Sequence, residues 1–295
     1  RYARRQAARM ASDSWLLWIL CSSACLSMYD LCKKASVKNN SVFPTLFLTS
    51  FTGWAALSLT LLLTGRMGDA VGIASRHIPL LLVKSLIVAA SWTATYIALR
   101  TLPITCAAPI RASGPFWTLI GAVLIFSEIP NAVQSVGMAF VLAGCVFFSL
   151  SSGKDRAAGG LKAVALAFTG TVLGSCSALY DKHLMQGIGI LPLTVLWWFL
   201  GGMTVIYAVL AALDHRGFEW RFTMPLTGIL LTASDAFYFT AIAAPDAQIS
   251  VLSLIRRSSI VLTFFIGGAL FRERDLRRKA FALAAILAGV LLLCL

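Results

Sequence analysis

The 295-residue chain has few charged side chains for its length, and acidic side chains are the scarcest. It carries 12 Asp and Glu against 25 Lys and Arg, and charged residues make up 13% of the chain while hydrophobic residues make up 59%. A soluble domain has about 25% charged and about 45–50% apolar residues. A soluble globule of this size is therefore excluded, because it could not bury so much apolar surface.

The chain also lacks the motifs of common enzymes and metal sites. Its only histidines are His77, His183 and His215, and there is no HExxH, GxSxG or P-loop sequence. The seven cysteines lie mostly inside apolar runs, without a CxxC pair, which is typical of buried structural thiols. We therefore predict no enzyme activity, no metal site and no cofactor.

Long apolar runs divide the chain into about ten candidate spans, since a helix needs about 20 apolar residues to cross about 30 Å of hydrocarbon. The basic residues fall mainly in short segments between the runs, which favours membrane anchoring over nucleic-acid binding. The fold class that we predict is all-α integral membrane. The runs predict helices over 14–35, 42–64, 78–99, 104–127, 132–150, 161–186, 191–213, 222–244, 247–271 and 276–295.

Short motifs recur in order in the two halves of the chain. Three recur 145 residues later and one recurs 151 residues later. Such an ordered series predicts an internal duplication. The matches are Ile110-Arg111 with Ile255-Arg256, Glu128 with Glu273, Leu142-Ala143-Gly144 with Leu287-Ala288-Gly289, and, at the longer offset, Tyr29-Asp30 with Tyr180-Asp181.

The duplication predicts four segments along the chain. A basic N-terminal segment covers 1–13, the first five-helix repeat 14–150, a linker 151–160, and the second five-helix repeat 161–295. Because each half has an odd number of spans, the second half enters the membrane from the opposite side. The ten transmembrane helices then form two inverted five-helix repeats, with a substrate site near the midplane between them.

The segments from Tyr96 to Glu128 and from Ile255 to Glu273 resemble the drug/metabolite transporter superfamily, in particular its EamA-type ten-helix members. The resemblance implies a multi-pass transporter, expected in the inner membrane of a bacterium, with both termini cytoplasmic. The positive-inside tendency disagrees, because the basic cluster between Arg272 and Lys279 would then lie outside. The expected partners are the lipid bilayer, a small-molecule substrate and protons or a counter-substrate. Nucleic acid is not expected as a partner, and the sequence leaves open whether the chain forms a homodimer.

Charged residues at membrane depth are candidates for a substrate site, because each costs about 2.5–3.5 kcal/mol there unless it pairs or lines a wet cavity. Arg111 and Arg256 each stand 17 residues before the glutamate that ends their helix. A guanidinium binds phosphate or carboxylate through two parallel hydrogen bonds. We predict a substrate-binding site made of Arg111, Arg256, Arg257, Trp92, Tyr96, Tyr238 and Asp235. The alternative is a helix latch in which Asp235 or Asp30 neutralises the arginines.

A second group of residues is predicted to act in gating or coupling. Asp30 and Lys33 stand one helical turn apart, and the duplicated tyrosine and aspartate make an accident less plausible. An intrahelical ion pair near the water interface is the alternative. The group comprises Tyr29, Asp30, Lys33, Tyr180, Asp181 and Lys182.

The function predicted from these residues is secondary transport of a small polar metabolite by alternating access. Deep arginines favour an organic anion, phosphorylated or carboxylated, and repel a cation. An amino-acid or drug exporter coupled to protons is the alternative among carriers. A channel or membrane scaffold is the alternative outside them.

Overall fold

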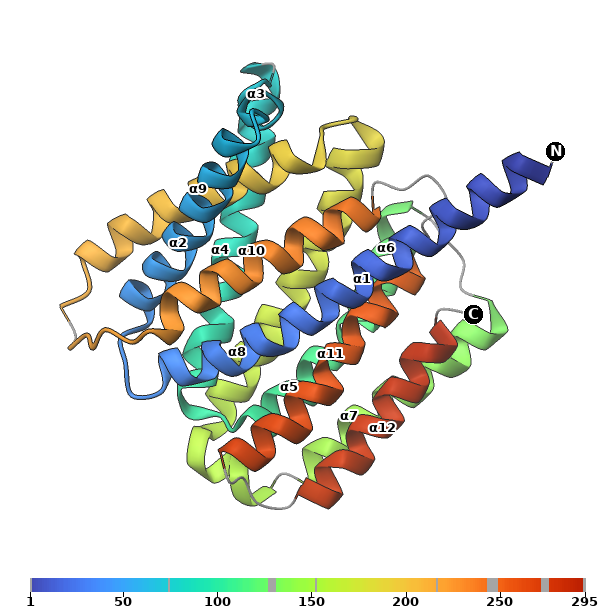
Figure 1. The fold of residues 1–295 in the computed structure, drawn as a ribbon. Coiled ribbons are helices and arrows are strands. Elements are labelled where there is room, and N and C mark those ends of the chain that lie inside the picture. Colours follow the sequence, from blue (N-terminus) through green and yellow to red (C-terminus); the bar gives the residue numbers. More distant parts are fainter. Residues whose placement is uncertain are drawn as a thin grey trace.

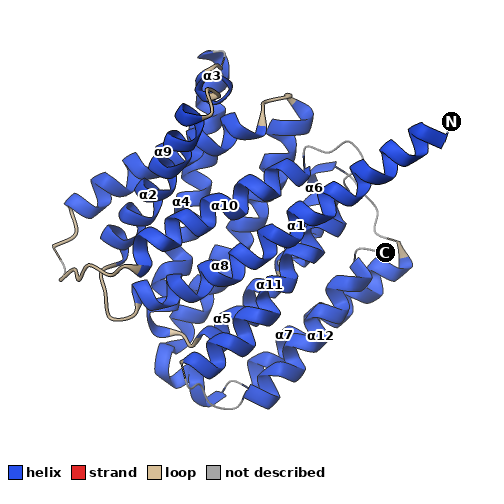
Figure 2. Cartoon of the chain, in the orientation of Figure 1, coloured by secondary structure: helices blue, strands red, loops and turns tan. Residues whose placement is uncertain are grey.

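The computed structural model describes residues 2–73, 75–126, 131–151, 153–215, 217–242, 249–271 and 276–293. Within these ranges every regular element is a helix (Figure 2). The elements are α1 (Tyr2–Val37), α2 (Val42–Leu63), α3 (Met67–Val71), η1 (Ser75–His77), α4 (Ile78–Thr101), α5 (Ile104–Ala112), α6 (Gly114–Phe126), α7 (Ala132–Ser151), α8 (Gly153–Lys182), η2 (His183–Gly187), α9 (Pro192–Ala212), α10 (Thr223–Ile242), α11 (Ile249–Leu270) and α12 (Leu276–Leu293).

Each of the ten predicted segments overlaps helix in the described part of the chain. The segment predicted over 104–127 is divided into α5 and α6 at Ser113. Pro109 lies inside α5 and removes a backbone donor, and the Gly114-Pro115 step follows directly. These residues weaken the helical ladder, so the break falls beside Arg111.

Two other boundaries differ from the prediction. The first helix begins earlier than predicted, because α1 begins at Tyr2 and includes the basic segment; alanine, arginine and glutamine there favour helix, and no glycine or proline interrupts them. The predicted linker is partly helical, because α8 begins at Gly153 and changes direction at Gly160, whose φ is 72°. Only glycine adopts such a backbone without strain.

The helices pack as pairs drawn from distant parts of the chain (Figure 1). The long α1 lies along α10 and against α11, and α4 lies along α8. α2 packs on α9, while α7 and α12 form a pair at one side of the molecule. This arrangement leaves α1, α4, α5, α8, α10 and α11 around a common centre.

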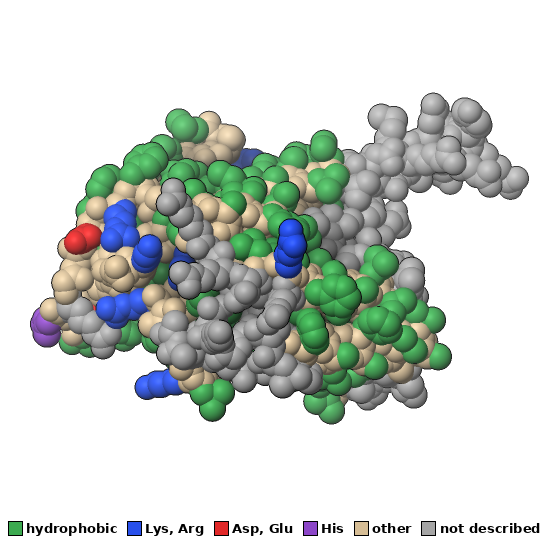
Figure 3. Space-filling model, turned by 90° about the horizontal axis from the view of Figure 1, so that it is seen from below, with side chains coloured by type: hydrophobic (Ala, Val, Ile, Leu, Met, Phe, Trp, Pro, Cys, Tyr) green, Lys and Arg blue, Asp and Glu red, His purple; other side chains and the backbone are tan. Residues whose placement is uncertain are grey.

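The outer surface of the bundle is apolar. Leucine side chains such as Leu63 and Leu161 are 79% and 74% exposed, and Figure 3 shows hydrophobic side chains over much of one face, with charged ones gathered at one end. Among the described residues, four helices are long and apolar enough to cross a membrane: Val42–Leu63, Ser75–Thr101, Gly160–Met185 and Pro192–Ala212. The full set of ten spans stays a prediction.

One end of the bundle is tied by a hydrogen-bond network around Asn40. Its side-chain oxygen accepts from the backbone N–H groups of Ser41, at 2.9 Å, and Glu219, at 3.1 Å, and its amide donates to the Glu219 carbonyl at 2.7 Å. The Arg221 guanidinium donates to the carbonyls of Ala35 and Lys38, at 2.7 and 2.8 Å. The loop before α10 therefore holds the last turn of α1.

Candidate functional site

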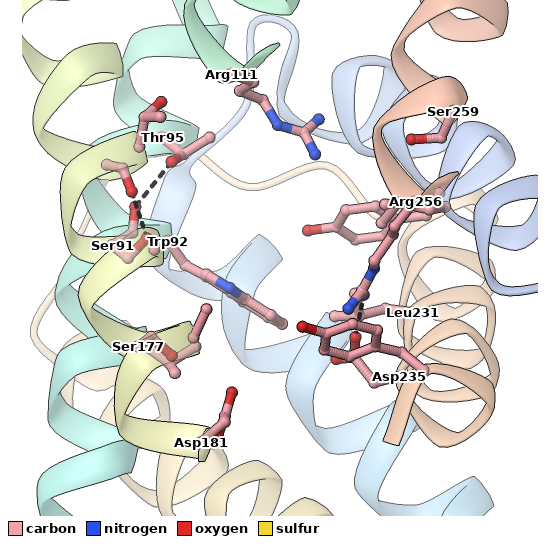
Figure 4. Close-up of a pocket in the computed structure, with 18 of the residues that line it drawn as sticks. Ser91, Trp92, Thr95, Arg111, Ser177, Asp181, Leu231, Asp235, Arg256 and Ser259 are labelled. Carbon is pink, nitrogen blue, oxygen red and sulfur yellow. Dashed lines mark hydrogen bonds and ion pairs between the residues drawn. The ribbon is translucent and has the colours of Figure 1, made fainter. Parts of the chain in front are cut away.

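A cavity of about 240 Å³ lies at the centre of the bundle. Helices α1, α4, α5, α8, α10 and α11 contribute charged or polar side chains to its wall, and Phe199 of α9 and Phe239 of α10 contribute apolar ones. Trp92 of α4 projects into the middle of this space (Figure 4). The site is thus built from both halves of the chain.

The first ion pair joins Asp30 of α1 to Arg111 of α5. The Asp30 side chain is 2% exposed, and Arg111 reaches the cavity from the end of α5, just before the helix break. Removing two opposite charges from water is tolerable only when they meet in good geometry. Asp30 therefore supplies the counter-charge that a buried guanidinium requires.

The second ion pair joins Lys84 of α4 to Asp181 of α8, with 2.6 Å between the ammonium nitrogen and a carboxylate oxygen. The ammonium also donates to the Ser177 hydroxyl at 2.5 Å. All three side chains are buried. This pair joins two long helices, α4 and α8, that belong to different halves of the sequence.

The third ion pair joins Asp235 of α10 to Arg256 of α11. The Arg256 guanidinium also lies over the Tyr238 ring, with 4.0 Å between its central carbon and the ring centroid. A guanidinium on an aromatic face gains a cation–π attraction. Figure 4 shows Arg256 and Asp235 on one side of the cavity, opposite Ser177 and Asp181.

Lys33 of α1 lines the cavity without a carboxylate partner among the described residues. Its ammonium lies 5.1 Å from the centroid of the Tyr29 ring and 5.0 Å from that of Tyr96. The residue is 4% exposed. The neighbouring Lys34 points elsewhere, because its ammonium donates to the carbonyls of Leu99 and Leu102 at the end of α4.

The structure brings most of the predicted site residues to the cavity, but not all of them. Trp92, Arg111, Tyr238, Asp235, Arg256, Tyr29, Lys33 and Asp181 line it. Tyr96 is fully buried beneath Lys33, and the Tyr180 hydroxyl donates to the Leu80 carbonyl at 3.1 Å. Lys182 is not among the described lining residues, and the side chain of Arg257 lies outside what the structure describes.

Several polar groups that line the cavity were not among the predicted site residues. Lys84 is a candidate from the sequence as a charge deep in an apolar run, but nothing in the sequence pairs it with Asp181. Ser177 and Ser259 carry no distinguishing pattern. The Ser259 hydroxyl is buried without a hydrogen-bond partner among the described residues, and Figure 4 shows it pointing into the cavity, as Arg111 does.

Residues 13–150 match the EamA-like transporter family. This part of the chain is EamA-family transporter sequence. The family comprises transporters and not enzymes, which confirms the prediction of a carrier without catalytic residues. No curated protein matches the sequence.

A solved crystal structure of another protein has the same fold as this chain. The two sequences are 16% identical, the superposition has a TM-score of 0.66, and it covers 95% of this chain and 96% of the other. At this identity the likeness concerns the fold alone. It extends the fold relationship over the second half, beyond the residues that match the family.

Proposed function

We propose that the central cavity is the substrate site of a secondary transporter that moves a small organic anion, carboxylated or phosphorylated, by alternating access. The observation that carries the proposal is the charge of the cavity wall. Four cations line it, namely Lys33, Lys84, Arg111 and Arg256, against two carboxylates, Asp181 and Asp235. Asp30 pairs with Arg111 from outside the described lining.

The size of the cavity supports a small cargo. Its volume is about 240 Å³. A phosphorylated or carboxylated metabolite of a few carbons suits this space.

We also propose that the two halves are inverted repeats, since their interhelical hydrogen bonds recur. The Ser27 hydroxyl of α1 donates to the Ser259 carbonyl of α11 at 3.1 Å. In the matching contact with the halves exchanged, the Ser175 hydroxyl of α8 donates to the Gly114 carbonyl of α6 at 2.9 Å. Ser259 follows Gly114 by 145 residues, the offset of the arginine match.

These hydrogen bonds favour an offset of 148 residues between α1 and α8, because Ser175 follows Ser27 by that number. The cavity supports the same offset. The α1 residues that line it are 26, 29 and 33, and 174, 177 and 181 are among those of α8. In this register Lys33 corresponds to Asp181, whereas the Tyr29-Asp30 and Tyr180-Asp181 match is three residues away.

Substitution of the arginines tests the anion site. Arg111→Gln and Arg256→Gln should each weaken binding of the best anionic ligand by about ten- to a hundredfold, since each removes a charge-assisted contact worth about 1.5–3 kcal/mol. Arg→Lys should rescue only in part, because lysine keeps the charge but not the bidentate geometry. Unchanged affinity in every Gln variant would contradict an anion site and favour a zwitterionic or neutral cargo.

A matched experiment tests the gating role of the aspartates. Asp30→Asn and Asp181→Asn keep the shape of the side chain and remove its charge. Each should slow transport by purified protein in vesicles. The side of the membrane to which the cavity opens should depend on which ion pairs its aspartates form. Normal transport by both variants would show that the two carboxylates only hold helices together.

A further inference from the structure

Lys33 differs from every other described cation of the cavity wall. Arg111, Lys84 and Arg256 each meet a carboxylate. Lys33 meets two tyrosine rings, whose quadrupoles offset only part of the desolvation of a buried ammonium. The described residues around the cavity thus form three neutral pairs and leave one positive charge, on Lys33.

The position of Lys33 also breaks the equivalence of the two halves. If each position of α1 corresponds to the position of α8 that lies 148 residues later, as proposed above, Asp181 is the residue equivalent to Lys33. Asp181 pairs with Lys84, whose ammonium lies 2.6 Å from its carboxylate. At equivalent positions the first half therefore offers a cation without a carboxylate partner among the described residues, and the second half offers a carboxylate that is paired.

The cavity wall also offers apolar and aromatic surface, which suits an uncharged, partly aromatic body. Trp92, Phe199, Leu231 and Phe239 contribute to it. The Ser259 hydroxyl lies on the α11 side of the cavity, without a hydrogen-bond partner among the described residues.

We propose that Lys33 is the residue that receives the negative group of the substrate, and that the substrate is an organic monoanion, a carboxylate with an apolar body. This inference rests on the proposed function. A single negative charge brings the net charge of these four cations and three carboxylates to zero. A phosphate ester with two charges leaves one negative charge uncompensated in a low-dielectric site, and an amine adds a second positive one.

Five probes of similar size separate these charges: phenylacetate, phenyl phosphate, phenylacetamide, phenylalanine and phenethylamine. Purified protein in detergent is heated with each, because a ligand that binds only the folded state raises the unfolding temperature by mass action. We expect phenylacetate to stabilise the protein most. Phenyl phosphate binding as tightly, or no stabilisation by phenylacetate, overturns the inference.

Substitutions then test whether Lys33 binds the negative group of the ligand. Lys33→Gln should weaken phenylacetate binding by about ten- to a hundredfold, and Lys33→Arg should keep most of it. Lys38→Gln is the matched control, since Lys38 is an exposed lysine just beyond α1 and should bind phenylacetate as the natural protein does. If Lys33→Gln does not fold, Lys33→Met replaces it, and the probe series on the unaltered protein still decides the charge of the ligand.

The outcomes distinguish this inference from the proposed function. If Arg111→Gln and Arg256→Gln weaken phenylacetate binding while Lys33→Gln does not, the anion site stands and the role of Lys33 falls. If phenethylamine alone stabilises the protein, both fall. If phenylalanine stabilises it more than phenylacetate, the substrate is a zwitterion and the monoanion is wrong.

Discussion

The ion pair between Lys84 and Asp181 allows a direct test of the electrostatics of the bundle. Its partners are 3% and 7% exposed, 2.6 Å apart, and on helices that come from different halves of the chain. The perturbation consists of Lys84→Met, Asp181→Leu and the double variant. Each substitution replaces a charged side chain with an apolar one of comparable size.

The expected magnitudes follow from the burial of the pair. Removing one partner leaves an uncompensated buried charge, so each single variant should lose about 3–5 kcal/mol of unfolding free energy. Replacing both partners removes the desolvation penalty together with the attraction, so the double variant should lose no more than about 1 kcal/mol. The free energy that couples the two positions should therefore be at least about 5 kcal/mol.

Denaturant titration in detergent micelles measures these four unfolding free energies. The exposed pair between Arg66 and Asp69, at 3.1 Å and with side chains 60% and 50% exposed, is the control. Arg66→Met should change stability by less than about 1 kcal/mol. The reasoning is refuted if the losses of the two single variants add, within about 0.5 kcal/mol, to that of the double variant.

Three further predictions concern the repeat and the packing. Single cysteines introduced at Glu128 and Glu273 should react with an impermeant thiol reagent from opposite faces of the membrane; labelling from one face would exclude inverted repeats. Asn40→Ala should lower the unfolding free energy by about 1–3 kcal/mol, because it strips buried backbone groups of their partner, and an unchanged titration midpoint would contradict this. Gly228→Leu should lower the unfolding temperature, since Gly53 and the α2 backbone lie against that face; a normal temperature would show that α2 and α10 can separate freely.

Most of the helical layout was predictable from composition and periodicity. Apolar runs of about 20 residues between breakers have few structures open to them in a bilayer. The break between α5 and α6 followed from Pro109 and the Gly114-Pro115 step, which are local effects. The short elements α3 and η1 were not predicted, because they lie in connections where neither apolar periodicity nor a capping pattern marks a helix.

The pairing of the charges at the site was not predictable in the same way. An aspartate in an apolar run must find a partner or a wet cavity, and this marks Asp30, Asp181 and Asp235 as site candidates. Which cation each one meets depends on the rotation of helices that are distant in the sequence. Asp181 is bound by Lys84 of the other half, although its own half contains Arg256.

Tyr29 and Tyr180 illustrate how two residues with matching sequence neighbours can occupy different positions at the site. Tyr29 and Tyr180 each precede an aspartate, yet Tyr29 lines the cavity while the Tyr180 hydroxyl binds the backbone of α4. A shift of three residues turns a helix by nearly one full turn, about 300° at 3.6 residues per turn. The two motifs therefore stay near the same face but at different depths. If the two halves are aligned by matching residue types alone, Asp30 corresponds to Asp181. If they are aligned by the residues that line the cavity, Lys33 corresponds to Asp181. Because one of these is a cation and the other a carboxylate, the choice of register decides whether the two halves present the same charge or opposite charges to a substrate.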